Sequence, residues 1–416
     1  MDVLTIITIL IIISAAFSYL NERFIKLPGT IGVVTISVVA SIIILIAGKT
    51  SNGITDTIIS VAHTIDFSKV LLDVMLGLLL FASALHFDYQ KLKEQRLPVF
   101  VLSTAGVIVS AGVFAGLLYG VTKLFHTDIP LIYCFLFGSL ISPTDPIAVA
   151  AILRKSRIPP RLNTIISGES LFNDGFGLVL FVVFLNFADP TTANLTTSQI
   201  VSLFSQEVIG GIGIGLIIGY LGYLLMRSIK NFQTILLISI ALVLSISVIS
   251  NRFHASIPLA AVTAGLMVGN KSPDKNNITK RSLKQIWQLI DEVLNTILFV
   301  MIGLQLVIMP FLRNYWLTGA LCIIMILIAR MVSVSLPAIV LLRKLNFGNL
   351  FILTWAGLRG GISVAMALSL PASPYKKIIL SSCYCIVIFS IIVQGLTLNK
   401  VVERVVNSKA VSPKKD

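Results

Sequence analysis

The sequence predicts an all-α protein that crosses a membrane about thirteen times, and its composition and the length of its apolar runs carry this prediction. Of the 416 residues, 56% are hydrophobic and 12% are charged, and the mean hydropathy is +0.96. A soluble domain carries about 25% charged residues. The apolar runs are mostly about 20 residues long, which is the length of a membrane-spanning helix and not of a barrel strand.

The apolar runs divide the chain into thirteen predicted spans separated by short loops. They cover residues 3–20, 27–48, 70–86, 97–122, 129–152, 163–186, 206–226, 232–250, 254–269, 285–309, 316–341, 348–370 and 377–397. The residues from 399 to 416 form a short, basic tail that we expect to be disordered.

The loop charges predict the orientation and explain the net charge of +14. Most of the 32 Lys and Arg residues lie in the loops that share one side with the C-terminal tail. Because positive loops stay in the cytoplasm, the N-terminus is expected outside and the C-terminus inside. We therefore expect the positively charged loops to lie against the lipid bilayer, and we expect no nucleic-acid partner. The four cysteines lie in apolar segments with neither disulfide nor zinc spacing, and no cofactor is predicted.

The fifth and twelfth spans resemble each other. Residues 146–153 and 361–368 align with half of their positions identical, and the two spans cross in opposite directions because they are seven apart. Pro143 and Pro146 interrupt the first near mid-depth, and Gly357, Gly360 and Gly361 interrupt the second. Paired interrupted spans predict a secondary transporter built from inverted six-helix repeats around one connecting span, with its site where spans 5 and 12 cross.

The break in the fifth span contains a carboxylate. Thr144-Asp145-Pro146 has the form of a helix start, with Asp145 as the capping residue before a proline in the first turn. Its polar groups at mid-membrane need a protein-lined or wet cavity. A proline kink that Asp145 merely caps is the alternative to a role in a site.

The sixth span carries two more carboxylates within an apolar run. Ser170 and Asp174 share one helix face, whereas Glu169 and Asp174 point about 140° apart, so one ion cannot easily meet both carboxylates. Asp174 is nearer the middle of the span and is the better carrier. The neutral oxygens of Ser170 and Asn173 beside it suit a hard cation such as Na⁺.

Two arginines also fall within spans and need partners, because an unpaired buried guanidinium is costly. Arg330 lies near mid-depth in the eleventh span, and Arg359 lies in the break of the twelfth. We favour a structural pair of Glu169 with Arg330 and a fixed positive charge from Arg359 at the crossing. Arg359 is the alternative partner of Glu169.

These motifs, taken in order, resemble those of bacterial sodium/proton antiporters of the NhaP type, in the cation:proton antiporter family that includes the animal sodium/proton exchangers. The matching runs are residues 142–146, 168–175 and 357–361, with a looser match over 79–88. The similarity covers essentially the whole membrane domain, residues 1–398. The resemblance does not extend to the large regulatory tail of the animal exchangers.

The resemblance implies an architecture and an assembly. A scaffold would comprise about residues 1–86 and 232–309, and a mobile core about 97–186 and 316–397, joined by the connecting span 206–226. It also implies a homodimer in the bacterial cytoplasmic membrane.

The resemblance further implies the site and its activity. Asp174 would bind Na⁺ or H⁺ in alternation, with Thr144, Asp145 and Ser170 as cation ligands or near-ligands and Asn173 orienting the site. The Asn-Asp pair resembles the electroneutral branch, which exchanges one proton for one monovalent cation. The implied protein is a transporter and not an enzyme, exchanging Na⁺ and Li⁺ for H⁺; K⁺/H⁺ or broad cation exchange is the alternative.

Two other classes fit the sequence less well. An intramembrane aspartyl protease needs a Gly-x-Gly-Asp signature, whereas Phe172 and Asn173 precede Asp174. A channel would need a carbonyl-lined filter motif, which the sequence lacks.

Overall fold

The computed structural model describes residues 3–47, 67–124, 129–145, 149, 158–188, 197–270, 278–306, 312–337 and 347–411, and every regular element within them is helical. In the labels, α marks an α-helix and η a π-helical turn. The first half contains α1 (Val3–Leu20), η1 (Asn21–Ile25), α2 (Gly29–Ala47), α4 (Phe67–Val70), η2 (Leu71–Met75), α5 (Leu76–His86), α6 (Tyr89–Glu94), α7 (Arg96–Ser103), α8 (Ala105–Leu124), α9 (Leu131–Ile141) and α11 (Pro160–Ala188). The second half contains α12 (Thr197–Arg227), α13 (Phe232–Arg252), α14 (Ile257–Asn270), α15 (Ile278–Gln305), α16 (Leu312–Pro337), α17 (Phe347–Trp355), α18 (Gly361–Ser369), α19 (Lys376–Phe389), η5 (Ser390–Gln394) and α20 (Gly395–Val411).

The described residues include nine helical stretches that are long and apolar enough to cross a membrane, and three shorter apolar helices. Each predicted span coincides with one of these, or with the broken pair α17 and α18. The all-helical fold is therefore confirmed. The count of thirteen crossings stays a prediction, because the shorter helices do not establish a crossing by length.

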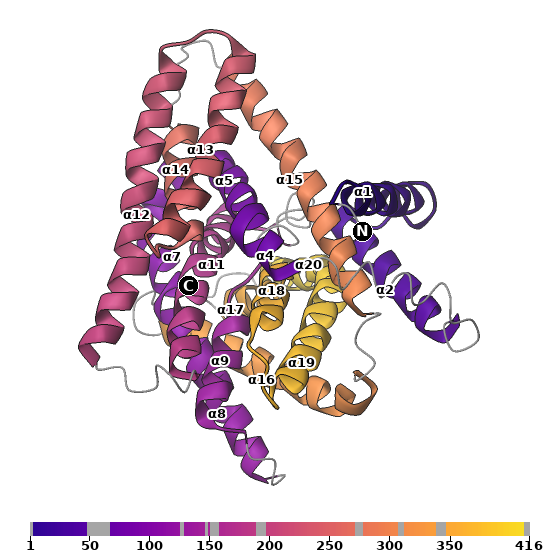
Figure 1. Cartoon of the computed structure of the whole chain (residues 1–416). Helices are drawn as coiled ribbons and strands as arrows, with labels where there is room; N and C mark the ends of the chain where they lie inside the picture. The colour runs from indigo at the N-terminus through magenta and orange to yellow at the C-terminus, as the bar shows by residue number, and fades with distance from the viewer. Residues whose placement is uncertain are drawn as a thin grey trace.

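The helices pack in two groups (Figure 1). One group contains α1, α2, α5, α13, α14 and α15, and the other contains α8, α9, α11, α16, α18 and α19. The long helix α12 contacts α13 and α14 at one edge. The second group holds both interrupted spans, so the site lies on the face where this group meets the first.

Small residues let α12 approach α14 closely. A Cβ added at Gly215 would lie 2.4 Å from the carbonyl oxygen of Ala260. Gly215 thus serves helix packing, as small residues do in membranes, where lipid gives no hydrophobic drive to association.

The tail differs from the expectation of disorder, because α20 continues to Val411. Leu398 and Val402 share one helix face and are fully buried in the core, and Val401 and Val405 pack against it. The basic residues on the other side hid this apolar stripe from an argument based on charge.

Candidate functional site

The fifth span breaks at its expected place. Helix α9 ends at Ile141, and residues 143–145 have no regular secondary structure. The Ser142 hydroxyl donates to the Gly138 carbonyl at 2.6 Å, which satisfies one of the carbonyls at the end of the helix. The half-helix predicted to start at Pro146 lies outside the described residues, apart from Val149.

The twelfth span is also broken, between Trp355 and Gly361, and the two breaks meet. The backbone N–H of Asp145 donates to the carbonyl of Leu358 at 2.8 Å. A Cβ added at Gly360 would lie 2.2 Å from Oδ2 of Asp145, so the absence of a side chain there admits the carboxylate. The crossing therefore brings Asp145 against the second broken span.

Arg359 lies at this crossing and binds the end of the first half-helix. Its Nη1 donates to the carbonyl of Ser142 and, at 2.8 Å, to that of Pro143. Its backbone N–H donates to Oγ of Ser390 at 2.8 Å, and that hydroxyl donates to Oε1 of Gln394 at 2.6 Å. The guanidinium thus compensates carbonyls at the negative end of α9.

Three polar side chains link the first break to α11. The hydroxyls of Thr144 and Ser170 are 2.9 Å apart, and Nδ2 of Asn173 donates to Oγ1 of Thr144 at 2.7 Å. All three side chains are buried. Thr144, Ser170 and Asn173, which we singled out from the sequence, are therefore brought together in one hydrogen-bonded group.

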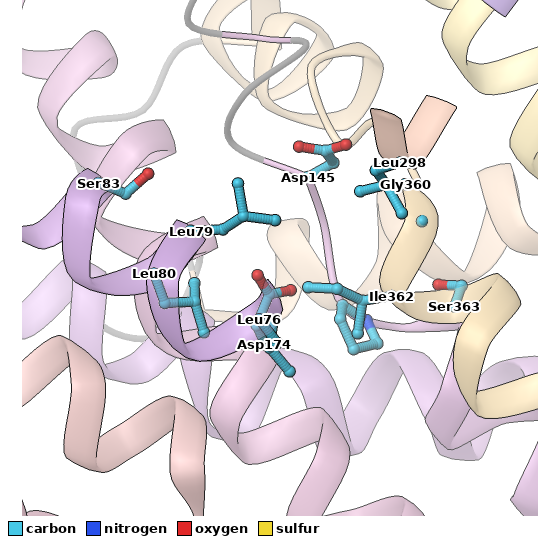
Figure 2. A pocket seen from close by; sticks show the side chains of 12 residues that line it. Leu76, Leu79, Leu80, Ser83, Asp145, Asp174, Leu298, Gly360, Ile362 and Ser363 are labelled. Atoms are coloured by element: carbon cyan, nitrogen blue, oxygen red, sulfur yellow. The ribbon is translucent and has the colours of Figure 1, made fainter. Parts of the chain in front are cut away.

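Asp174 is 1% exposed, and its Oδ2 has no hydrogen-bond partner among the residues the structure describes. It lines a cavity of about 20 Å³ together with Asp145, and leucines 76, 79 and 80 of α5 form one wall (Figure 2). This volume holds about one water-sized particle. An ionised carboxylate in such a place needs a proton or a cation to compensate its charge.

Glu169 does not face this cavity. Arg330 of α16 donates through Nη1 to Oε1 of Glu169 and through Nη2 to Oε2 at 2.9 Å. Both side chains are buried. Arg330 and Arg359 were the two partners that the sequence left open for Glu169. In the structure the partner is Arg330, because Arg359 binds carbonyl groups instead.

A larger cavity of about 640 Å³, called the vestibule below, lies beside the site. It lies between the end of α5, the start of α11, the start of α2 and the middle of α15, and its carboxylates are Asp88, Asp291 and Glu292. Ser83 lines both the vestibule and the small cavity beside Asp174. The two cavities are therefore neighbours that meet at Ser83.

The sequence argument missed Ser390, Gln394 and Ser363. The first two hold the backbone of the second break, and Ser363 of α18 lines the cavity with Asp174. Polar residues four apart in an otherwise apolar span were a signal for Ser390 and Gln394 that could have been used. No group of three or more His, Cys, Asp or Glu side chains that could hold a metal occurs among the described residues.

The family model of the transmembrane sodium/hydrogen exchangers matches residues 9–404. The chain belongs to this family. It is 40% identical over 415 residues to the Na⁺/H⁺ antiporter NhaP of Pseudomonas aeruginosa, covering 97% of each chain. It is 30% identical over 346 residues to the Na⁺/H⁺ antiporter NhaH of Halobacillus dabanensis, covering 81% of this chain and 83% of that one.

A solved structure has the same fold. The sodium proton antiporter MjNhaP1 from Methanocaldococcus jannaschii, at pH 8, superposes with a TM-score of 0.79 at 16% identity, covering 97% of this chain and 99% of that one. The resemblance to the NhaP type is therefore confirmed, and the chain is a multi-pass membrane protein of a transporter family.

Proposed function

We propose that the protein exchanges Na⁺, and also Li⁺, for H⁺ across the bacterial cytoplasmic membrane, with Asp174 as the carrier of both ions. One observation is the main support for this proposal. Asp174 is a buried carboxylate with an unpartnered oxygen among the described residues, in a small cavity between two broken spans. The activities named for the relatives from Pseudomonas and Halobacillus support the same reaction.

The exchange follows from competition for one carboxylate. A proton or a sodium ion neutralises Asp174, and neutralisation lowers the cost of moving it through an apolar environment. The empty anionic site is held in place by that cost. Neither ion can then cross without the other, and the exchange needs no ATP.

The cation ligands in this proposal are Asp174, Asp145, Ser170 and Thr144. Their carboxylate and hydroxyl oxygens are the ligands a hard cation prefers. Asn173 orients the group through its hydrogen bond to Thr144. Glu169 with Arg330 forms a structural charge pair, and Arg359 supplies the charge at the crossing.

Movement in the proposal occurs between a scaffold, residues 1–86 and 232–309, and a core, residues 97–186 and 316–397. The division of helix contacts into two groups supports it. The connecting span is 206–226, and the protein acts as a homodimer with its N-terminus outside and its C-terminus, with the tail 399–416, in the cytoplasm. With this orientation the vestibule faces the cytoplasm, so cytoplasmic ions would reach Asp174 through it.

The Asp174→Asn variant is expected to abolish exchange, because an amide neither ionises nor neutralises a cation. The measurement is dissipation of an imposed pH gradient in proteoliposomes on addition of Na⁺, Li⁺ or K⁺. Glu403→Gln, which makes the same chemical change at an exposed position of α20, should exchange like the wild type. Equal rates for wild type and Asp174→Asn would exclude Asp174 as the carrier.

The ranking of the three ions in the wild type decides the substrate. Dissipation by Na⁺ and Li⁺ but not K⁺ supports the proposal. Dissipation by K⁺ at the lowest concentration would replace it with K⁺/H⁺ exchange, and no dissipation by any ion would refute cation/proton exchange.

Exchange by the wild type is expected to be independent of membrane potential, because one proton for one Na⁺ moves no net charge. The measurement compares Na⁺-driven rates with the potential held at zero and at about −100 mV. Movement of one net charge across 100 mV is worth about 2.3 kcal/mol. A strong change of rate with the potential would therefore contradict one-for-one stoichiometry.

A further inference from the structure

The vestibule wall contains polar side chains that the carrier site does not use. On this wall α15 contributes Asp291, Glu292 and Asn295, and the first turn of α2 contributes Thr30. Asp291 and Asn295 are four residues apart and therefore share a face of α15.

Asn295 is fully buried and has an unusual set of partners. Its Nδ2 donates to the backbone carbonyl of Asp291 at 2.8 Å and to Oδ1 of the same residue at 3.1 Å. Its Oδ1 has no hydrogen-bond partner among the described residues, and neither has the buried Oγ1 of Thr30. Buried polar atoms normally have a partner, and these two oxygens belong to residues that line one cavity and lack a partner among the described residues.

The charges around these oxygens select a cation. Three carboxylates line the vestibule, from Asp88, Asp291 and Glu292, and among the described lining residues Lys91 carries the opposing positive charge. The Glu292 carboxylate accepts from Nε2 of Gln288 at 2.9 Å, which turns it along the helix surface. Asp291, held by Asn295, is thus the carboxylate beside the unpartnered amide oxygen.

We propose that Asp291, Asn295 and Thr30 form a second site for a monovalent cation in the vestibule, separate from Asp174. A carboxylate, an amide oxygen and a hydroxyl are ligands of the kind that hard cations prefer. Given the exchange proposed above, the site concentrates Na⁺ beside the carrier, because the vestibule and the cavity of Asp174 share Ser83 as a lining residue.

The test uses the Asp174→Asn variant, in which the carrier is removed and binding is measured without transport. Thermal unfolding in detergent is compared in NaCl and in choline chloride at equal ionic strength. A cation that binds only the folded state raises the midpoint in a saturable manner. We expect NaCl to raise the midpoint of Asp174→Asn, and the second change Asp291→Asn to remove that rise.

The matched control is Asp174→Asn with Glu292→Gln. It removes the same charge one residue away, where the carboxylate is turned toward Gln288, and it should retain the rise with NaCl. Asp291→Asn keeps the size of the side chain and an oxygen for Asn295, so the fold should persist. Thr30→Val, on a different helix, should weaken the rise independently.

Two results would overturn the second site. One is an Asp174→Asn variant whose midpoint is the same in NaCl and choline chloride. The other is an equal loss with Asp291→Asn and Glu292→Gln, which would indicate diffuse attraction by the acidic wall. Because the readout is stability, its failure is distinct from a failure of exchange in the wild type. In the otherwise wild-type chain, Asp291→Asn should raise the Na⁺ concentration for half-maximal exchange several-fold, and Glu292→Gln should not.

Discussion

Removal of either charge of the Glu169–Arg330 pair is expected to destabilise the protein by about 3–5 kcal/mol, which is the usual cost of leaving one buried charge unpaired. The pair is bidentate, with Nη2 of Arg330 at 2.9 Å from Oε2 of Glu169, and both side chains are buried. It joins α11 to α16, so its loss loosens the group of helices that carries both breaks. Glu169→Gln and Arg330→Gln should therefore lower the thermal unfolding midpoint in detergent.

A double variant distinguishes the loss of the whole ion pair from the cost of leaving one charge unpaired. Replacement of a buried ion pair by apolar residues of similar volume is often neutral or stabilising. Glu169→Met with Arg330→Met should thus unfold at a higher temperature than either single variant. A double variant less stable than both single variants would contradict the explanation that the single variants lose stability because one buried charge is left unpaired.

The matched control for Glu169 lies five residues along the same helix. Asp174 is equally buried, but its Oδ2 has no hydrogen-bond partner among the described residues. Asp174→Asn should therefore keep or raise the midpoint in choline chloride. Functional sites often contain groups that are unfavourable for stability. A fall of the midpoint as large as that of Glu169→Gln would contradict the distinction between a structural and a functional carboxylate.

The helices could be predicted well from the sequence because every membrane span needs an apolar run of about 20 residues. Helix α1 has the predicted bounds, and α13 differs from them by two residues at its end. Helix α12 extends from Thr197, whereas the prediction began at residue 206, because hydropathy stops at the polar turns while the backbone continues its hydrogen bonds. The π-helical turns at Leu71–Met75 and Ser390–Gln394 left no signal, since one extra residue per turn changes no hydropathy.

The candidate residues could be found from sequence because charge and proline are rare in a membrane. Asp145, Asp174, Arg330 and Arg359 were conspicuous for that reason. Their contacts were harder to predict. Helix geometry placed Glu169 and Asp174 on different faces, but the partner of Glu169 depends on how α11 and α16 pack, and that is a tertiary property. Ser390 reaches the backbone of Arg359 from another span for the same reason.

Replacement of Arg359 by lysine is expected to slow exchange by roughly 10–100-fold, although the charge is kept. One nitrogen of the guanidinium donates to two successive carbonyls, those of Ser142 and Pro143, and so fixes the break that carries Asp145. A lysine ammonium could donate to two carbonyls, but it lies on a shorter and more flexible stem than the planar guanidinium and would not hold both carbonyls in the same positions. Misplacement of a reacting group by about 1 Å can cost about 100-fold in rate. The measurement is the initial rate of Na⁺-driven gradient dissipation at equal amounts of reconstituted protein.

Two further variants divide the effect of Arg359 into charge and position. Arg359→Gln removes the charge and should be at least as impaired as Arg359→Lys. Ser390→Ala keeps the guanidinium but removes the acceptor of the Arg359 backbone N–H, and its loss should be smaller, because the fork to the Ser142 and Pro143 carbonyls remains. Helical content measured by circular dichroism must stay at the wild-type level for each comparison. If Arg359→Lys exchanges as fast as the wild type and Arg359→Gln does not, the crossing needs only the charge. If Arg359→Gln is also unimpaired, the broken spans hold Asp145 without help from this residue, and the role assigned to Arg359 is wrong.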